Sequence, residues 1–157
     1  WRKAEEWILT SEIGKPQMVT LVNSTDVPQL IPQFQQWVAD QWGNVQTPAV
    51  SPGESDFPTP IFALENDKLL GGLAFTRHIK PDDDSVGVWI NALYVSPDHR
   101  KRGIAACLIQ MAEVEAVKFG IDELYVYTDV PIIYQKQGWE ICKTVDDHTV
   151  LRRALAG

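Results

Sequence analysis

The chain has 157 residues, 45% of them hydrophobic and 22% charged, which suits one soluble globular domain and is too short for two full-sized ones. Its 14 Lys and Arg against 21 Asp and Glu give a formal net charge of −7. That balance argues against a general nucleic-acid binder, which needs a basic face. The longest apolar run, residues 69–75, falls far short of the roughly 20 residues that a membrane-spanning helix requires.

The elements are predicted in chain order from hydrophobic periodicity and turn residues. Residues 1–17 are expected to be an N-terminal extension or tag, and residues 18–157 form the domain. Helices are predicted from Asp26 to about Trp42 and over residues 103–119 and 132–137, with a proline-rich loop at 47–60. Strands are predicted at 18–23, 61–65, 69–79, 86–95, 124–128, 139–145 and 149–155. This order indicates a mixed α/β, or α+β, domain around one central sheet.

Cysteine and histidine usage favours neither a disulfide framework nor a metal site. Cys107 and Cys142 belong to no C-x-x-C pair, and the three histidines are scattered, so no metal is expected. Both cysteines are predicted to be buried thiols in a reducing compartment, which makes the cytoplasm the expected location.

A concentrated basic turn interrupts the acidic chain between a strand and a helix. The strand ends near Val95, the turn carries Arg100, Lys101 and Arg102, and the helix opens at Gly103. The first N–H groups of a helix have no internal partner and bind phosphate where small side chains let it approach. Neither a P-loop nor a G-x-G-x-x-G motif is present, so the turn predicts a separate kind of diphosphate cradle.

Together, two motifs and the element order resemble the GNAT superfamily of N-acetyltransferases. The first is R/Q-x-x-G-x-G/A, here residues 100–105, following Leu93, Val95 and Pro97 in the pattern L-x-V-x-P. The second is Y-x-x-x-G-hydrophobic, here residues 134–139. The resemblance covers about 140 residues, from Met18 to the C-terminus, and leaves residues 1–17 outside it.

The resemblance implies acetyl-CoA as cosubstrate, and a mostly antiparallel sheet with splayed strands and flanking helices. The end of the strand would pair with pantetheine, and the following turn and helix would hold the pyrophosphate. The cofactor-binding residues implied are Leu93, Tyr94, Val95, Arg100, Lys101, Arg102, Gly103, Ile104, Ala105, Ala106 and Tyr134. Dimers are common in the family, so a homodimer is an open expectation.

The same resemblance places a catalytic acid at Tyr134, because a phenol can donate a proton to a thiolate of similar basicity. The route for the amine proton is left open between two residues and a water chain without a dedicated base, as in some relatives. Asn91 stands where many relatives have Glu, and it could order a water but cannot take a proton. Asp129 is the nearest acidic candidate and equally a candidate cap for the short helix after it.

The acceptor is expected to be a primary amine of a small molecule or peptide, and the acidic composition favours a cationic one. Trp89, His78 and Trp37 are candidates to line its pocket, against core or surface roles for the same residues. Two alternatives stay open. One is a non-catalytic acyl-CoA-binding or regulatory domain of the same fold, and the other is a phosphate-binding α/β interaction domain.

Overall fold

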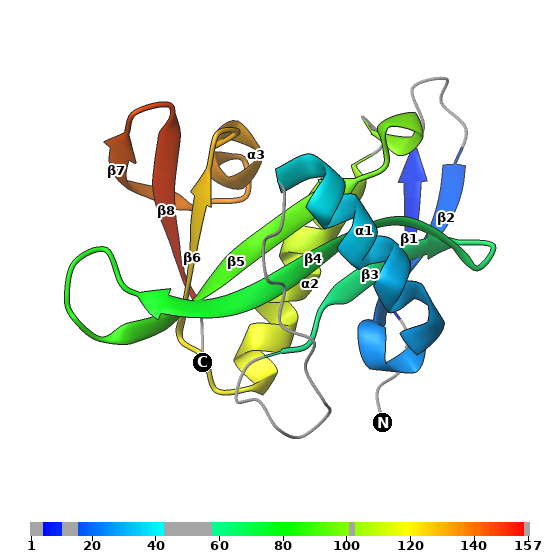
Figure 1. Cartoon of the computed structure of the whole chain (residues 1–157), viewed down its shortest axis with the longest axis horizontal. Helices are drawn as coiled ribbons and strands as arrows, with labels where there is room; N and C mark the ends of the chain where they lie inside the picture. Colours follow the sequence, from blue (N-terminus) through cyan, green and yellow to red (C-terminus); the bar gives the residue numbers. More distant parts are fainter. Residues whose placement is uncertain (1–4, 11–15, 43–57, 101–102, 156–157) are drawn as a thin grey trace.

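A computed structural model describes residues 5–10, 16–42, 58–100 and 103–155. Its strands form one eight-stranded sheet of order β1-β2-β3-β4-β5-β6-β8-β7 (Figure 1). All neighbours are antiparallel except β5 and β6, which confirms the predicted fold class. The strands are β1 (Glu5–Thr10), β2 (Pro16–Asn23), β3 (Ile61–Glu65), β4 (Lys68–Ile79), β5 (Val86–Val95), β6 (Glu123–Thr128), β7 (Glu140–Val145) and β8 (His148–Ala154). The α-helices are α1 (Ile31–Trp42), α2 (Ile104–Lys118) and α3 (Ile132–Gln135).

Two parts of the N-terminal region differ from the predictions. The helix expected from Asp26 begins instead at Ile31, after two 3-10 turns, and Asn23 rather than Asp26 caps the first turn by accepting a hydrogen bond from the Thr25 N–H. Strand β1 pairs with β2, which begins at Pro16, so the boundary expected after residue 17 falls within β2. The predicted loop at 47–60 lies mostly outside the described residues.

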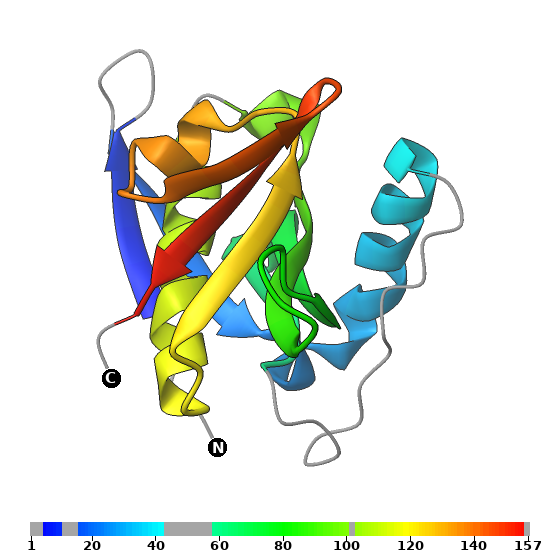
Figure 2. The ribbon, with the colours of Figure 1, turned by 90° about the vertical axis from the view of Figure 1, so that its left-hand side faces the viewer.

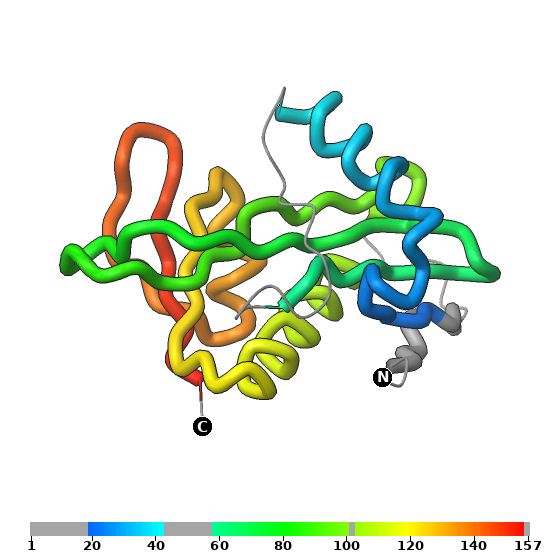
Figure 3. Tube along the Cα trace, turned by 60° about the horizontal axis from the view of Figure 1, so that its bottom comes forward, coloured from blue at the N-terminus to red at the C-terminus, as the bar shows by residue number. Residues whose placement is uncertain are grey.

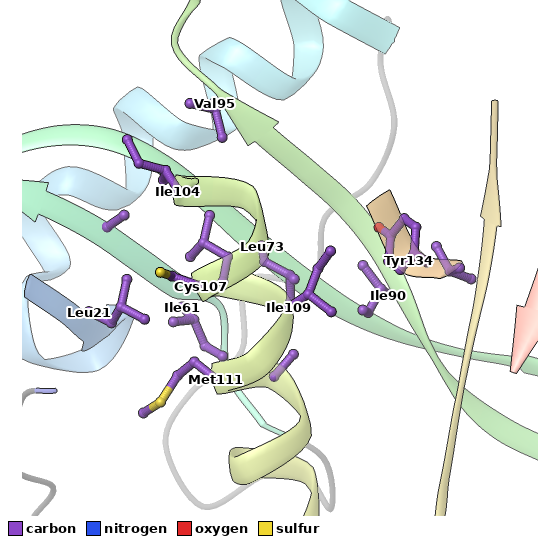
Figure 4. Packing of buried hydrophobic residues seen from close by; sticks show 14 of the residues in the cluster. Leu21, Ile61, Leu73, Ile90, Val95, Ile104, Cys107, Ile109, Met111 and Tyr134 are labelled. Atoms are coloured by element: carbon purple, nitrogen blue, oxygen red, sulfur yellow. The ribbon is translucent and has the colours of Figure 1, made fainter. Parts of the chain in front are cut away.

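The core lies on both faces of the sheet, because α1 and α2 pack on opposite sides of it (Figure 2). Under α2, the buried side chains of Leu21, Leu73 and Ile90 belong to the larger cluster, together with Ile109 of α2 itself (Figure 4). Under α1, Phe34 and Val38 pack with Phe62 and Ala92. Strand alternation sends successive side chains to opposite faces, so apolar residues at adjacent strand positions supply both clusters.

The cysteine prediction is half right. Cys107 is buried in α2, but Cys142 is exposed. Cys142 lies on β7, the edge strand, where all six residues are exposed, and an edge strand with no layer over it cannot bury a thiol. Among the described residues, no helix is long and apolar enough to cross a membrane.

Candidate active site

The sheet opens where β5 stops pairing with β6. Their parallel pairing covers three residue pairs and ends at Ile90 opposite Val126. On the other side of β5, Ala92 lies opposite Ala74 and Ile90 opposite Phe75, which leaves Asn91 as the extra residue of a β-bulge. A bulge bends its strand and increases the local twist. The end of β5 therefore diverges from β6.

The divergence creates a cleft of about 1120 Å³. Its walls come from the end of β5, the start of α2, the end of β6, and α3 with the turn after it. All of the predicted cofactor-binding residues that the structure describes, including Leu93, Tyr94 and Val95, line this cleft. Lys101 and Arg102 lie outside the described residues.

The amino end of α2 faces the cleft with features that suit an anion. Gly103 is its N-cap, with a left-handed φ of 82° and no side-chain capping hydrogen bond. The N–H of Cys107 makes the first helical bond, to the Gly103 carbonyl at 3.1 Å. The N–H groups before it have no helical partner, and the helix dipole adds partial positive charge there. The small side chains of Ala105 and Ala106 leave room for a phosphate to approach.

Arg100 is fixed beside this anion site. Its Nε donates to the Val95 carbonyl at 2.8 Å, and its guanidinium lies over the Tyr94 ring, 5.4 Å from the centroid. The ring and the carbonyl together orient the side chain and hold a positive charge at the cleft mouth. That placement suits the diphosphate cradle predicted from the basic turn.

Tyr134 lies inside the cleft on α3 (Figure 4), with only 2% of its surface exposed. Its ring makes an edge-on contact with Trp139 at 5.1 Å. Trp139 donates from Nε1 to Glu113 of α2 at 3.3 Å, and Arg153 of β8 donates to the other oxygen of that carboxylate at 3.0 Å. The acid candidate is therefore held by packing and by a polar bridge between α2 and β8. Burial raises the pKa of Tyr134 above its usual value, so the phenol stays protonated at neutral pH.

This raised pKa predicts a loss of stability in alkali. An unfolded tyrosine titrates near pH 10, so above about pH 10 the unfolded chain loses a proton that the folded chain retains. The free energy of unfolding should then fall by up to about 1.4 kcal/mol for each further pH unit per buried tyrosine. Urea unfolding between pH 8 and 11.5 should give a smaller fall for Tyr134→Phe than for the unchanged protein. Equal slopes in the two proteins would contradict the assigned environment.

Gln137 gives the cleft a hydrogen-bond acceptor that suits an amide-bearing ligand. Its Nε2 donates to the Ala106 carbonyl at 3.1 Å, which fixes the side chain across the start of α2. Its Oε1 is buried and has no hydrogen-bond partner among the described residues. A buried acceptor without a partner is costly, and the pantetheine arm of CoA carries amide N–H groups. The donors at α2 and this acceptor therefore fit CoA.

The two candidates for proton transfer from the amine both line the cleft. Asn91 lies half-buried at the bulge. Asp129 is exposed and does not cap α3: the N-cap is Pro131 without a side-chain bond, and Thr128 Oγ1 closes the turn by accepting from the Val130 N–H at 3.0 Å. Sequence reasoning missed His148, which lines the cleft and stacks on Tyr127 at 4.6 Å. The role of His148 is visible only in the structure, because β8, the strand that begins with it, pairs with β6.

A second cavity, of about 750 Å³, adjoins the cleft and contains two of the three acceptor candidates. Trp89 and His78 line it, with an edge-on ring contact at 5.8 Å and a hydrogen bond from Trp89 Nε1 to the His78 carbonyl. Trp37 lines neither cavity; it packs on Tyr94 at 5.5 Å, and its neighbour on α1, Trp42, reaches the cleft. Ile90, Asn91 and Tyr127 line both cavities.

A sheet that splays between β5 and β6, with the amino end of α2 facing the gap, is the architecture expected of an acyl-CoA-dependent transferase. The model of the acetyltransferase (GNAT) family matches residues 28–138, more than half of the chain. The chain belongs to the acetyltransferase (GNAT) family.

Solved structures of the same fold agree with this membership. Naa50 of Arabidopsis thaliana, in complex with the bisubstrate analogue CoA-Ac-MVNAL, is 21% identical, with 87% of this chain and 99% of that one covered at a TM-score of 0.60. The GNAT domain of S. lividans PAT is 17% identical, with 97% of both chains covered at a TM-score of 0.63. N-acetylglutamate synthase from Neisseria gonorrhoeae, complexed with coenzyme A and N-acetyl-glutamate, is 17% identical at a TM-score of 0.62, over 92% of this chain and 37% of that one.

Proposed function

We propose that this protein transfers an acetyl group from acetyl-CoA to a primary amine of a small molecule or peptide, by direct attack in a ternary complex. The observation that carries the proposal is the bulge at Asn91, which opens β5 onto a cleft containing both the anion site of α2 and the buried Tyr134. Acetyl-CoA supplies an acyl carbon activated as a thioester. The cleft supplies donors for its phosphates, an acceptor at Gln137, and an acid.

The proton balance assigns separate roles to the side chains in the cleft. In the transfer, the amine nitrogen bonds to the acyl carbon, the carbon–sulfur bond breaks, the nitrogen loses a proton and the sulfur gains one. Tyr134 holds the proton for the sulfur. An amine titrating near pH 10 must first lose a proton, and Asp129 and His148 line the cleft as groups able to accept it. Asn91 would hold a water between amine and acceptor.

The second cavity is the proposed acceptor site because it meets the cleft at Ile90, Asn91 and Tyr127. An amine entering through it reaches the bulge without crossing the face of the sheet that α2 covers. The alternative, a non-catalytic acyl-CoA-binding or regulatory domain, uses the same cleft but has no need of the acceptor cavity. The second alternative, a phosphate-binding interaction domain, would need only the start of α2.

Ligand-induced thermal shift tests the binding half of the proposal. A ligand present at 100 times its Kd stabilises the folded state by about 2.7 kcal/mol, so saturating acetyl-CoA should raise the melting temperature by several degrees. Desulfo-CoA should act similarly, and ADP much less, because it lacks the pantetheine arm. Equal shifts with ADP and acetyl-CoA would favour a simple phosphate-binding domain.

A further inference from the structure

The acceptor cavity lies between two hairpins at one end of the sheet. The β4–β5 turn and the β7–β8 hairpin lie at the same side of the molecule, on the left in both views (Figure 1, Figure 3). The cavity is lined by residues 76–81 of the first hairpin, by Lys143 and Val145 of the second, and by Tyr127 between them. Its volume is in the range of small-molecule sites.

Pairing register brings the cavity side chains to one face. Thr76 lies opposite Trp89, while Tyr127 and Lys143 both lie opposite Val150, and directly paired residues share a face. Trp89 also stacks against Tyr125 at 5.2 Å. This aromatic wall belongs to the face away from α2, and among the described residues no helix covers it beyond α1, which packs farther along on Phe62 and Ala92.

The charge of the cavity is opposite to that of the protein. Arg77, Lys80 and Lys143 are among its lining residues, and its described lining contains no Asp or Glu. Arg77 lies opposite Val88, one position out of step with Thr76, so its side chain leaves the strand on the other face and only the two lysines belong to the face of Trp89. The Lys80 side chain crosses this face: a Cβ added at Gly87 would come within 3.0 Å of Lys80 Cγ and 3.1 Å of the Tyr125 ring. The chain as a whole has a net charge of −7. This cavity nevertheless places lysine side chains beside the aromatic wall that Trp89 and Tyr125 form.

The carboxylates nearest this wall have partners of their own. Arg152 forms ion pairs with Glu140 at 3.3 Å, Glu123 at 3.7 Å and Asp82 at 4.0 Å. In the turn between β4 and β5, Asp83 accepts hydrogen bonds from the N–H and the hydroxyl of Ser85. These contacts reduce the competition of the acids for Lys143, whereas Lys80 also attracts Asp83. An anionic ligand group would therefore find Lys143 available.

We infer that the acceptor is an amine that also bears an anionic group, a carboxylate or a phosphate. Lys143 and Lys80 bind this group, and the body of the acceptor lies on Trp89 and Tyr127 with its amine directed to Asn91. This inference rests on the proposed function and deepens it by naming the substrate class. It replaces the cationic acceptor expected from overall composition, because the lining of one cavity decides recognition more directly than net charge does.

Matched acceptor pairs test the inference. 4-(Aminomethyl)benzoate against benzylamine, and O-phosphoethanolamine against ethanolamine, differ in the anionic group and distinguish carboxylate from phosphate. With initial rates corrected for the fraction of unprotonated amine, we expect at least about tenfold higher kcat/KM for the anionic member of one pair. Lys143→Glu should remove that preference mainly through KM, whereas Lys68→Glu, at the remote start of β4, should preserve it.

The possible outcomes separate the two proposals. Neutral amines or spermidine used as well as the anionic acceptors, or a preference unchanged by Lys143→Glu, would overturn the anionic class while leaving acetyl transfer intact. Absence of CoA release with every acceptor, despite a thermal shift by acetyl-CoA, would overturn the proposed function and this inference with it.

Discussion

Tyr134→Phe is expected to lower kcat about 100-fold, the scale of a lost general acid, while acetyl-CoA affinity changes by no more than about twofold. The phenyl ring keeps the edge-on contact with Trp139 and the burial in the cleft. Only the proton for the departing sulfur is removed. Initial rates of thiol release with saturating acetyl-CoA and amine, alongside calorimetric titration of acetyl-CoA, measure the two effects separately.

Trp139→Phe is the matched control for the packing around Tyr134. It changes the ring contact and removes the bond from Nε1 to Glu113, but it leaves the Tyr134 hydroxyl in place. A loss of turnover in this variant as large as that in Tyr134→Phe would show that packing rather than the hydroxyl is responsible. Unchanged turnover in Tyr134→Phe would remove the acid role.

Gly103→Val is expected to weaken acetyl-CoA binding by about 30-fold or more, the cost of losing roughly one charged hydrogen bond at the pyrophosphate. The residue has a φ of 82° at the N-cap of α2, a conformation that costs a non-glycine residue about 1–3 kcal/mol. A branched side chain also obstructs the approach to the helix N–H groups. Calorimetric titration with acetyl-CoA measures the affinity, and urea unfolding measures the strain.

Gly120→Val controls for the strain alone. Gly120 has a similar φ of 75° at the other end of α2, where an added Cβ would meet no described atom within 4 Å. This variant should lose comparable stability but bind acetyl-CoA normally. Equal losses of affinity in the two variants would mean that helix strain, not obstruction of the anion site, explains the effect of Gly103→Val.

Most of the fold could be predicted because its elements carry strong local signals. Strands β3, β4 and β5 alternate or run apolar between clear turns, and the turn at Asn66 and Asp67 has positive φ at both residues, as the tight connection of a hairpin requires. Helix α2 ends near Gly120, whose positive φ suits a helix C-terminus. The predicted start of α1 was wrong because Pro28 begins a separate 3-10 turn. Hydrophobic periodicity does not distinguish such a turn from the first turn of an α-helix.

The candidate site was predictable where it is contiguous in sequence. The turn and helix start and the motif around Tyr134 each lie within a few residues, and the structure brings residues 99–100 and 103–106 to one cleft with Tyr134. His148 and Lys143 were missed because their place depends on sheet order: β8 lies between β6 and β7, which no local pattern specifies. Gln137 lies within the predicted motif at 134–139, but its bond to the Ala106 carbonyl depends on how α2 and α3 meet. The bulge at Asn91 was equally hidden, since it depends on how β5 pairs with β4.

Net charge, like local sequence patterns, does not show how residues are arranged in space. The −7 balance correctly describes the whole chain but averages over regions of opposite character. The anion site at α2 and the cations of the acceptor cavity each depend on a few residues. Arg152, by pairing with Glu140, Glu123 and Asp82, neutralises part of the acidic surface that composition counts as available for a cationic partner.

Product analysis by mass spectrometry tests the central claim most directly. The protein is incubated with acetyl-CoA and the panel of amines, and both released CoA and N-acetylated amine are quantified. Direct transfer predicts equal amounts of the two products, formed only when protein and a suitable amine are both present. Acetyl-CoA that stabilises the protein but yields no N-acetylated amine from any member of the panel would contradict catalysis and identify a binding domain instead.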